Sequence, residues 1–133
     1  MYVVFGDEVL DSNEIIDLFN NESDFIVETD LTKSTKREDV IALKLRIGVE
    51  DIDSDSKFDQ YNEDIFEEYL DNAEEMITDF TDINFDYKKR FVTSAYKWEE
   101  LNNSIYLIVA LSDISLPLLK LNDVLNRLLK QND

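Results

Sequence analysis

Carboxylates are the most numerous ionisable side chains of this sequence, and they concentrate in one segment. Residues 50–86 hold fifteen acids and a single base, Lys57. In the part of this segment expected to be helical, acids recur four residues apart from Glu63 to Asp79, with no lysine or arginine between them. Each like-charge pair at i and i+4 destabilises a helix by about 0.2–0.5 kcal/mol. The row therefore indicates either a binding surface or a face kept acidic for solubility.

The binding interpretation rests on the spacing of the acids. Four residues of helix rise about 6 Å, which is close to the spacing of successive phosphates along a nucleic-acid strand. Rows of carboxylates at that spacing would imitate a phosphate backbone for a cationic cleft. The aromatic residues Tyr61, Phe66 and Tyr69 would supply the lasting part of the contact. The expected partner-binding residues are Asp51, Asp53, Asp55, Asp59, Glu63, Asp64, Glu67, Glu68, Asp71, Glu74, Glu75 and Asp79.

The linker at residues 51–62 resembles an EF-hand calcium loop. It has acids at loop positions 1, 3, 5 and 9, and a helix is expected after it. It departs from the motif at two strict positions, because Ser56 replaces the turn glycine and Asn62 replaces the bidentate glutamate. A strand rather than a helix is expected before it. An Asp/Ser turn that caps the helix is therefore favoured, and weak calcium binding is kept as an alternative.

The composition argues against an enzyme. The chain has no histidine and no cysteine, which removes the commonest general base, the thiolate nucleophile and the usual transition-metal ligands. Its two glycines cannot form a dinucleotide fingerprint or a P-loop. Among thirty-one acids some pair always lies close, so proximity alone says little about catalysis. We expect no catalytic residue, no cofactor and no bound metal.

The net charge of −18 restricts the partners. Residues 1–32 carry nine acids and no base, whereas residues 33–49 and the part from Tyr87 onward have a small excess of bases. Long-range repulsion opposes direct binding of nucleic acid, so a basic protein is the expected partner. The longest uncharged run, residues 101–112, is too short to span a membrane. The start MYVVFGDEV has no basic segment typical of a signal peptide, so a cytoplasmic protein is expected.

The pattern of apolar residues predicts one α+β domain over residues 1–133. The expected order is β-α-β-β-α-β-β-α, with short links that favour a mainly antiparallel sheet and helices packed on it. Asp11 or Ser12 is expected to cap the first helix, which ends at Asn20–Asn21, and Asn62 begins the long acidic helix, which ends near Phe80. The expected segments are strands at 2–5, 25–27, 40–49, 91–98 and 104–111, and helices at 12–19, 62–80 and 118–128.

Four strand and helix patterns add detail. Residues 40–49 alternate strictly, which predicts a half-buried strand with an outer face carrying Lys44 and Arg46. The run 105–111 has no polar alternation, which predicts a central strand covered on both faces. Tyr96 and Trp98 flank Lys97 and are expected to share one packed face. A leucine stripe from Leu118 to Leu128 is expected to lie in the core.

These observations predict a non-enzymatic inhibitor whose acidic surface blocks the cationic site of a nucleic-acid-processing protein. In charge and size it is similar to phage-encoded blockers of restriction or CRISPR nucleases and to immunity proteins of nuclease toxins. A monomer or small homodimer is expected, acting in the cytoplasm of the host cell if a phage encodes it. The alternative is a small structural or assembly component, such as a phage head–tail accessory protein, whose leucine or aromatic faces form an oligomer.

Overall fold

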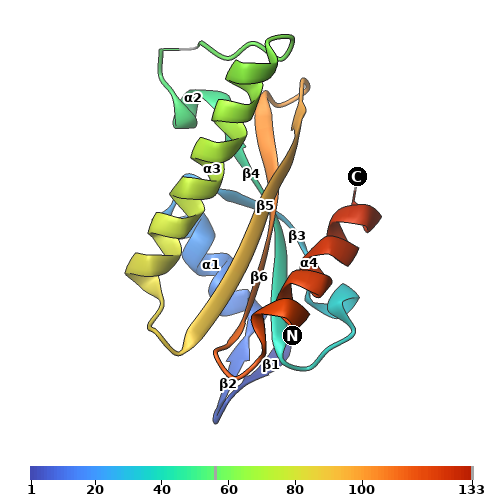
Figure 1. The fold of residues 1–133 in the computed structure, drawn as a ribbon. Coiled ribbons are helices and arrows are strands. Elements are labelled where there is room, and N and C mark those ends of the chain that lie inside the picture. The colour runs from blue at the N-terminus through green and yellow to red at the C-terminus, as the bar shows by residue number, and fades with distance from the viewer. Residues whose placement is uncertain (56, 133) are drawn as a thin grey trace.

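The computed structural model describes residues 1–55 and 57–132 (Figure 1). Ser56, which stands at the glycine position of the EF-hand pattern, lies outside the described residues. The elements in chain order are β1 (Tyr2–Phe5), β2 (Glu8–Asp11), α1 (Ser12–Glu22), β3 (Ile26–Asp30), the 3-10 helix η1 (Thr32–Thr35), β4 (Val40–Gly48), α2 (Val49–Ile52), α3 (Glu63–Asn84), β5 (Lys89–Glu99), β6 (Ser104–Asp113) and α4 (Leu118–Gln131).

Four strands form the main sheet in the order β3-β4-β6-β5, and every neighbouring pair is antiparallel. β6 lies between β4 and β5, and its residues 104–112 are all buried. The expectation of a central strand is therefore confirmed, because a strand without polar alternation has no side to turn toward water. β1 and β2 form a separate two-stranded sheet, whose turn has Gly6 at φ 62°.

The expected α+β class and the expected order of strands and helices are confirmed. β2, η1 and α2 are additional elements of four residues each, too short to show a hydrophobic period in the sequence. The caps expected at the two acidic helices are present: the Asp11 side chain accepts from the N–H of Asn13, and that of Asn62 accepts from the N–H of Ile65. Both helices run past their expected ends, α1 to Glu22 and α3 to Asn84.

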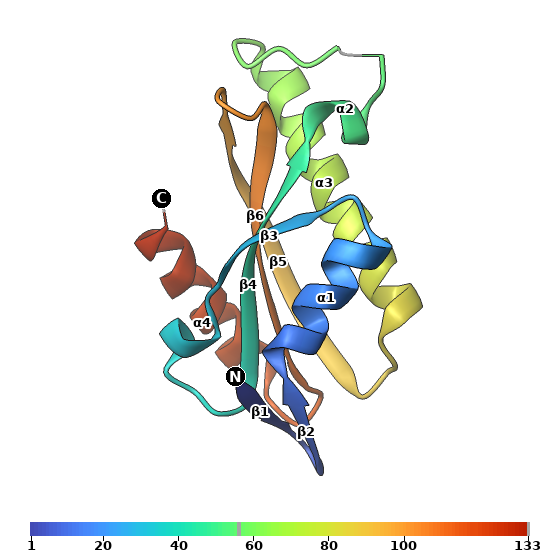
Figure 2. The ribbon, with the colours of Figure 1, turned by 180° about the vertical axis from the view of Figure 1, so that it is seen from behind.

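One face of the sheet is covered by α1 and α3 together (Figures 1 and 2). Ile41, Leu43, Leu45 and Ile47 point from β4 into this core. The two helices meet through Phe19 and Phe80, whose ring centroids are 4.6 Å apart. The two acidic segments of the sequence therefore lie on the same side of the sheet, which the sequence alone does not determine.

The opposite face is covered by α4. Leu121, Leu125 and Leu128 are buried there against β4 and β6, so this part of the leucine stripe belongs to the core. The outer face of β4 is less open than expected, because Val40 and Ala42 are fully buried beneath this layer.

The basic residues of β4 have partners within the protein. Arg46 forms an ion pair with Glu28 of β3, and the ammonium group of Lys44 lies 5.4 Å from the ring centroid of Tyr106. Both basic side chains are half-buried. They contribute to the packing of the sheet rather than forming a free cationic surface.

A bulge in β5 corrects one expectation. The register with β6 shifts between Ala95 and Lys97, which inserts one extra residue into the strand. Tyr96 therefore packs toward the α4 side, while Trp98 packs with the core under α3. The prediction that Tyr96 and Trp98 share a face is wrong, because strict alternation holds only where no residue is inserted.

Candidate functional site

The exposed acids of α3 form a continuous stripe along its outer side. Asp64, Glu68, Asp71, Glu75, Asp79 and Asp82 follow one another at intervals of three or four residues, which keeps them on one helical face. Eighteen residues of helix span about 27 Å. We define the α3 acidic surface as the exposed carboxylates Glu63, Asp64, Glu67, Glu68, Asp71, Glu75, Asp79 and Asp82.

Asp82 belongs to this surface although it is not among the residues predicted from the sequence. The helix was expected to end near Phe80, whereas it continues to Asn84. The signal that could have found it is the spacing, because Asp82 follows Asp79 by three residues and Glu75 by seven. A helix stop at Phe80 had no glycine or proline to support it.

Among the described residues, no basic group forms an ion pair with the α3 acidic surface. Within residues 1–55 and 57–132, none of the ion pairs involves an acid of α3. The acids at 63, 67, 71, 75 and 79 keep like charges four residues apart along the whole helix. Each of these contacts destabilises the helix by about 0.2–0.5 kcal/mol. This surface therefore remains free to accept cations from outside the molecule.

Glu74 differs from the other acids predicted to bind a partner. It is half-buried and points at the bulge of β5, where its Oε2 accepts a 2.8 Å hydrogen bond from the backbone N–H of Ala95. β5 is an edge strand with β6 on one side only, so the N–H groups that face away from β6 need another acceptor, and Glu74 supplies one to Ala95. Its role in the structure is to join α3 to the edge strand β5.

Of the four predicted acids of the linker, three are exposed to solvent and one is half-buried. Asp51, Asp55 and Asp59 are exposed, and Oδ1 of Asp59 accepts from the N–H of Tyr61. Asp53 is half-buried and accepts from the N–H of Asp55 and from the hydroxyl of Tyr69. The N–H of Asp55, followed by the Tyr69 hydroxyl, holds the pKa of Asp53 below its ordinary value. Asp53 therefore fixes the linker to α3.

The three aromatic residues expected at the contact have different environments. Tyr69 is 3% exposed and lies in the core, so the expectation that it grips a partner is wrong. Burial, followed by the hydrogen bond to Asp53, raises the pKa of its hydroxyl. Phe66 is half-buried beside Phe58. Tyr61 is 90% exposed and is the one of the three with a large free surface.

The acids of α1 extend the same side of the molecule. Glu14, Asp17 and Glu22 are exposed on α1, which covers the sheet beside α3 (Figure 2). Bases concentrate elsewhere. Lys36, Arg37, Lys120 and Arg127 line a cavity of about 350 Å³ between η1 and α4, on the other face of the sheet. The protein thus has an acidic side, formed by α1 and α3, and a basic side at η1 and α4.

The calcium alternative gains no support from the geometry. Among the residues that the structure describes, no three acidic side chains converge closely enough to hold a metal ion. Asp51 and Ile52 belong to α2, so the start of the EF-hand pattern is helical. The oxygens of Asp53 and Asp59 accept hydrogen bonds from their own loop and from Tyr69.

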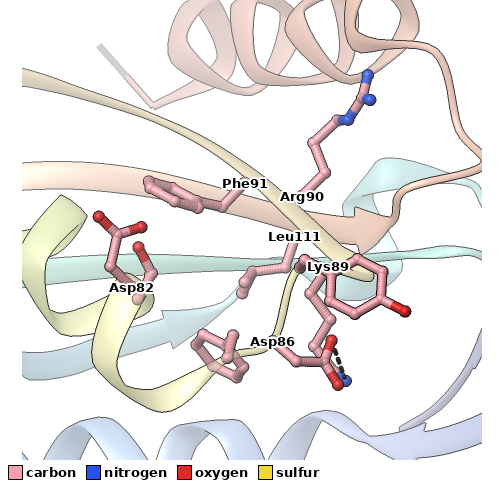
Figure 3. Close-up of a pocket in the computed structure, with 9 residues that line it drawn as sticks. Asp82, Asp86, Lys89, Arg90, Phe91 and Leu111 are labelled. Carbon is pink, nitrogen blue, oxygen red and sulfur yellow. Dashed lines mark ion pairs between the residues drawn. The ribbon is translucent and has the colours of Figure 1, made fainter.

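Two cavities lie at the ends of α3. The cavity near its carboxyl end, of about 300 Å³, is lined by acids, bases and aromatic rings (Figure 3). Lys89 lies 3.6 Å from Asp86 within it and 3.7 Å from Glu8, so this cavity contains its own cation. The cavity near the amino end, of about 330 Å³, lies beside Trp98 and the residues that precede α3.

Comparisons with known proteins identify no relative. The chain matches no protein-family model, no curated protein and no solved structure. Among the described residues, none of the helices has the length and apolar character needed to cross a bilayer.

Proposed function

We propose that this protein is a non-enzymatic inhibitor that occupies the cationic site of a nucleic-acid-processing protein. The observation that carries the proposal is the α3 acidic surface, with eight exposed carboxylates and no paired base along α3 in the part of the chain that the structure describes. The charges destabilise the helix on which they lie. A partner that supplies cations to this surface would offset the repulsion among the carboxylates. Binding of such a partner therefore explains why the acids stand together without bases.

The mechanism follows from the distribution of charge. The acidic side formed by α1 and α3 would steer a basic cleft toward it, giving fast association that weakens steeply as salt rises. Carboxylates about 6 Å apart along the helix would occupy the positions of phosphates and exclude the nucleic acid. The inhibitor would act as a monomer or small homodimer in the cytoplasm, against a nuclease or a CRISPR effector.

The test is a charge-reversal variant with a matched control. The α3 reversal variant carries Glu67→Lys, Asp71→Lys and Glu75→Lys. The control reverses three exposed acids outside α1 and α3, with the same change of net charge: Asp7, Glu38 and Asp123. Each protein is used to capture partners from a lysate at low salt and is eluted with a salt gradient. The captured partner is then assayed for nucleic-acid processing.

The proposal requires three results together. Wild-type protein and the control should retain a basic nucleic-acid-processing protein, release it as salt rises and inhibit its activity. The α3 reversal variant should lose both capture and inhibition while its melting temperature stays within a few degrees of wild type. Unchanged inhibition by the α3 reversal variant would refute the proposal.

The assembly alternative rests on three exposed apolar residues, one just before α4 and two in its first turn. Ile114, Leu118 and Leu119 are 48%, 48% and 73% exposed. A component that assembles through this group should form a ring or a concentration-dependent polymer, whereas the proposed inhibitor should stay a monomer or dimer. Light scattering after size-exclusion chromatography, with Leu119→Ser as the test variant, distinguishes the two.

A further inference from the structure

The cavity at the amino end of α3 is lined by aromatic rings and by acids. It lies between α2, the residues that precede α3, and the turn that joins β5 to β6. Phe58, Tyr61 and Trp98 supply the rings. Glu50 and Asp59 supply two exposed carboxylates. None of its lining residues among those described is a lysine or an arginine.

Two of the three rings of this cavity, Phe58 and Trp98, are held in place by packing and hydrogen bonds. The ring of Phe58 lies 5.4 Å from Trp98 and 5.1 Å from Tyr69, measured between centroids. The indole N–H of Trp98 donates a 2.9 Å hydrogen bond to Oδ1 of Asn103. The carbonyl of Asn103 accepts in turn from the N–H of Val49, which ties the turn to the start of α2. A preformed wall of this kind lowers the ordering cost of binding.

The charges around the cavity favour a cation. Glu50 and Asp59 belong to its lining, and the α3 acidic surface begins at Glu63, directly after this segment. The nearest base in the sequence, Lys57, is not part of the lining. The cavity of Figure 3 differs from this one in charge, because Lys89 already forms an ion pair with Asp86 there.

We infer that this cavity binds an arginine side chain of the basic partner, with the guanidinium plane against Trp98 or Phe58 and its N–H groups on Glu50 and Asp59. Arginine fits this combination because its guanidinium is planar, stacks on aromatic faces and donates to carboxylates in a fixed fork. The identity of the partner rests on the proposed function. The cavity would provide a local anchor at one end of the α3 acidic surface, whose other contacts are exposed and screened by salt.

The single tryptophan makes the inference measurable. Trp98 is the only tryptophan of the chain and lines the cavity, so its fluorescence reports occupation. The probe is a tri-arginine peptide with blocked ends, titrated at about 0.15 M salt, where long-range attraction is screened within about 8 Å. Peptides of the same length with citrulline or lysine replace the guanidinium by a neutral urea or by an ammonium.

The variants separate the cavity from general charge attraction. Glu50→Gln and Asp59→Asn are combined, because both residues are exposed and the amide introduced at position 59 retains an oxygen to accept from the N–H of Tyr61. The control combines Asp7→Asn with Glu38→Gln, which removes the same charge at two exposed positions outside the α3 acidic surface. Melting curves verify that both proteins fold.

The expected result is a saturable change of Trp98 fluorescence with tri-arginine, weakened at least tenfold in the Glu50/Asp59 variant and less than threefold in the control. The citrulline peptide should give no saturable change, and the lysine peptide should bind at least fivefold more weakly. Equal weakening by both variants, equal binding of lysine, or no saturable signal overturns the inference. The proposed function is judged separately, because capture by the α3 reversal variant does not depend on the fluorescence of Trp98.

Discussion

Two adjacent glutamates of α3 should respond in opposite directions to the same substitution. Glu74 accepts a hydrogen bond from the N–H of Ala95, whereas Glu75 is exposed and has like charges at i−4 and i+4, Asp71 and Asp79. The sequence presents them as an equivalent pair of acids. Replacing each with alanine therefore separates the contribution to the fold from the contribution to the surface.

The magnitudes follow from these contacts. Glu74→Ala leaves the N–H of Ala95 without its acceptor in a partly buried place, which costs about 1–3 kcal/mol. Relief of one like-charge contact with Asp71 returns about 0.2–0.5 kcal/mol. Glu75→Ala relieves two such contacts and should stabilise the protein by about 0.4–1 kcal/mol. The net cost in the first variant is about 0.5–2.8 kcal/mol, so for a chain of this length its melting temperature should fall by about 2–10 °C, while that of the second should rise by a few degrees.

Thermal and urea unfolding of both variants measure the difference. Glu74→Gln is the control, since its amide oxygen still accepts from Ala95, and its stability should match or slightly exceed that of wild type. A Glu74→Ala protein as stable as Glu75→Ala would refute the role given to Glu74. Binding adds a second readout, because Glu75 belongs to the α3 acidic surface and Glu74 does not.

Three further predictions concern stability. Because the pKa of Asp53 is lowered in the folded protein, its charged form stabilises the fold above the ordinary aspartate pKa of about 3.9, and this contribution is lost as the pH falls through the lowered value. Urea unfolding should show Asp53→Asn less stable than wild type at pH 7, and this difference should shrink as the pH falls below about 3.9. A difference that does not change with pH would contradict this. Raising the salt concentration from about 0.02 to 0.5 M should raise the melting temperature of wild type, because screening weakens the repulsion among acids. The increase should be smaller in the α3 reversal variant. Equal increases in the two proteins would mean that the repulsion comes from acids outside α3. Leu121→Ala removes a fully buried side chain and should lower the free energy of unfolding by about 2–5 kcal/mol. Leu118→Ala, at a half-exposed site, should lower it by less than about 1 kcal/mol in the same urea unfolding experiment. Similar losses would mean that the leucine stripe is not divided between core and surface.

Much of the fold could be predicted because its signals are local. The apolar run at 105–111 and the cap residues Asp11 and Asn62 each depend on a few neighbouring residues. The shared face of α1 and α3 depends on the contact of Phe19 with Phe80, which are far apart in the chain. Hydrophobic period does not encode such pairings.

In the candidate site, too, the features that depend on local spacing could be predicted, and those that depend on distant contacts could not. The outward acids of α3 follow from helical spacing, and most of them lie where the sequence predicts. The role of Glu74 could not be predicted, because it depends on how α3 packs against the edge strand β5, beside a bulge that shifts the register by one residue. The same bulge turns Trp98 toward the core under α3, near the acids that precede the helix.

The order of strands in the sheet has a consequence for folding. β5 and β6 form a hairpin with a short turn, so their pairing closes quickly. β4 must then pair with β6, and Gly48 pairs with Ser104, so the whole acid-rich segment from 50 to 86 lies within the loop that this step closes. Repulsion among its carboxylates stretches that loop and adds to the free-energy cost of closing it. The docking of β4 on the hairpin is therefore the step at which we expect the charge of α3 to control the rate of folding.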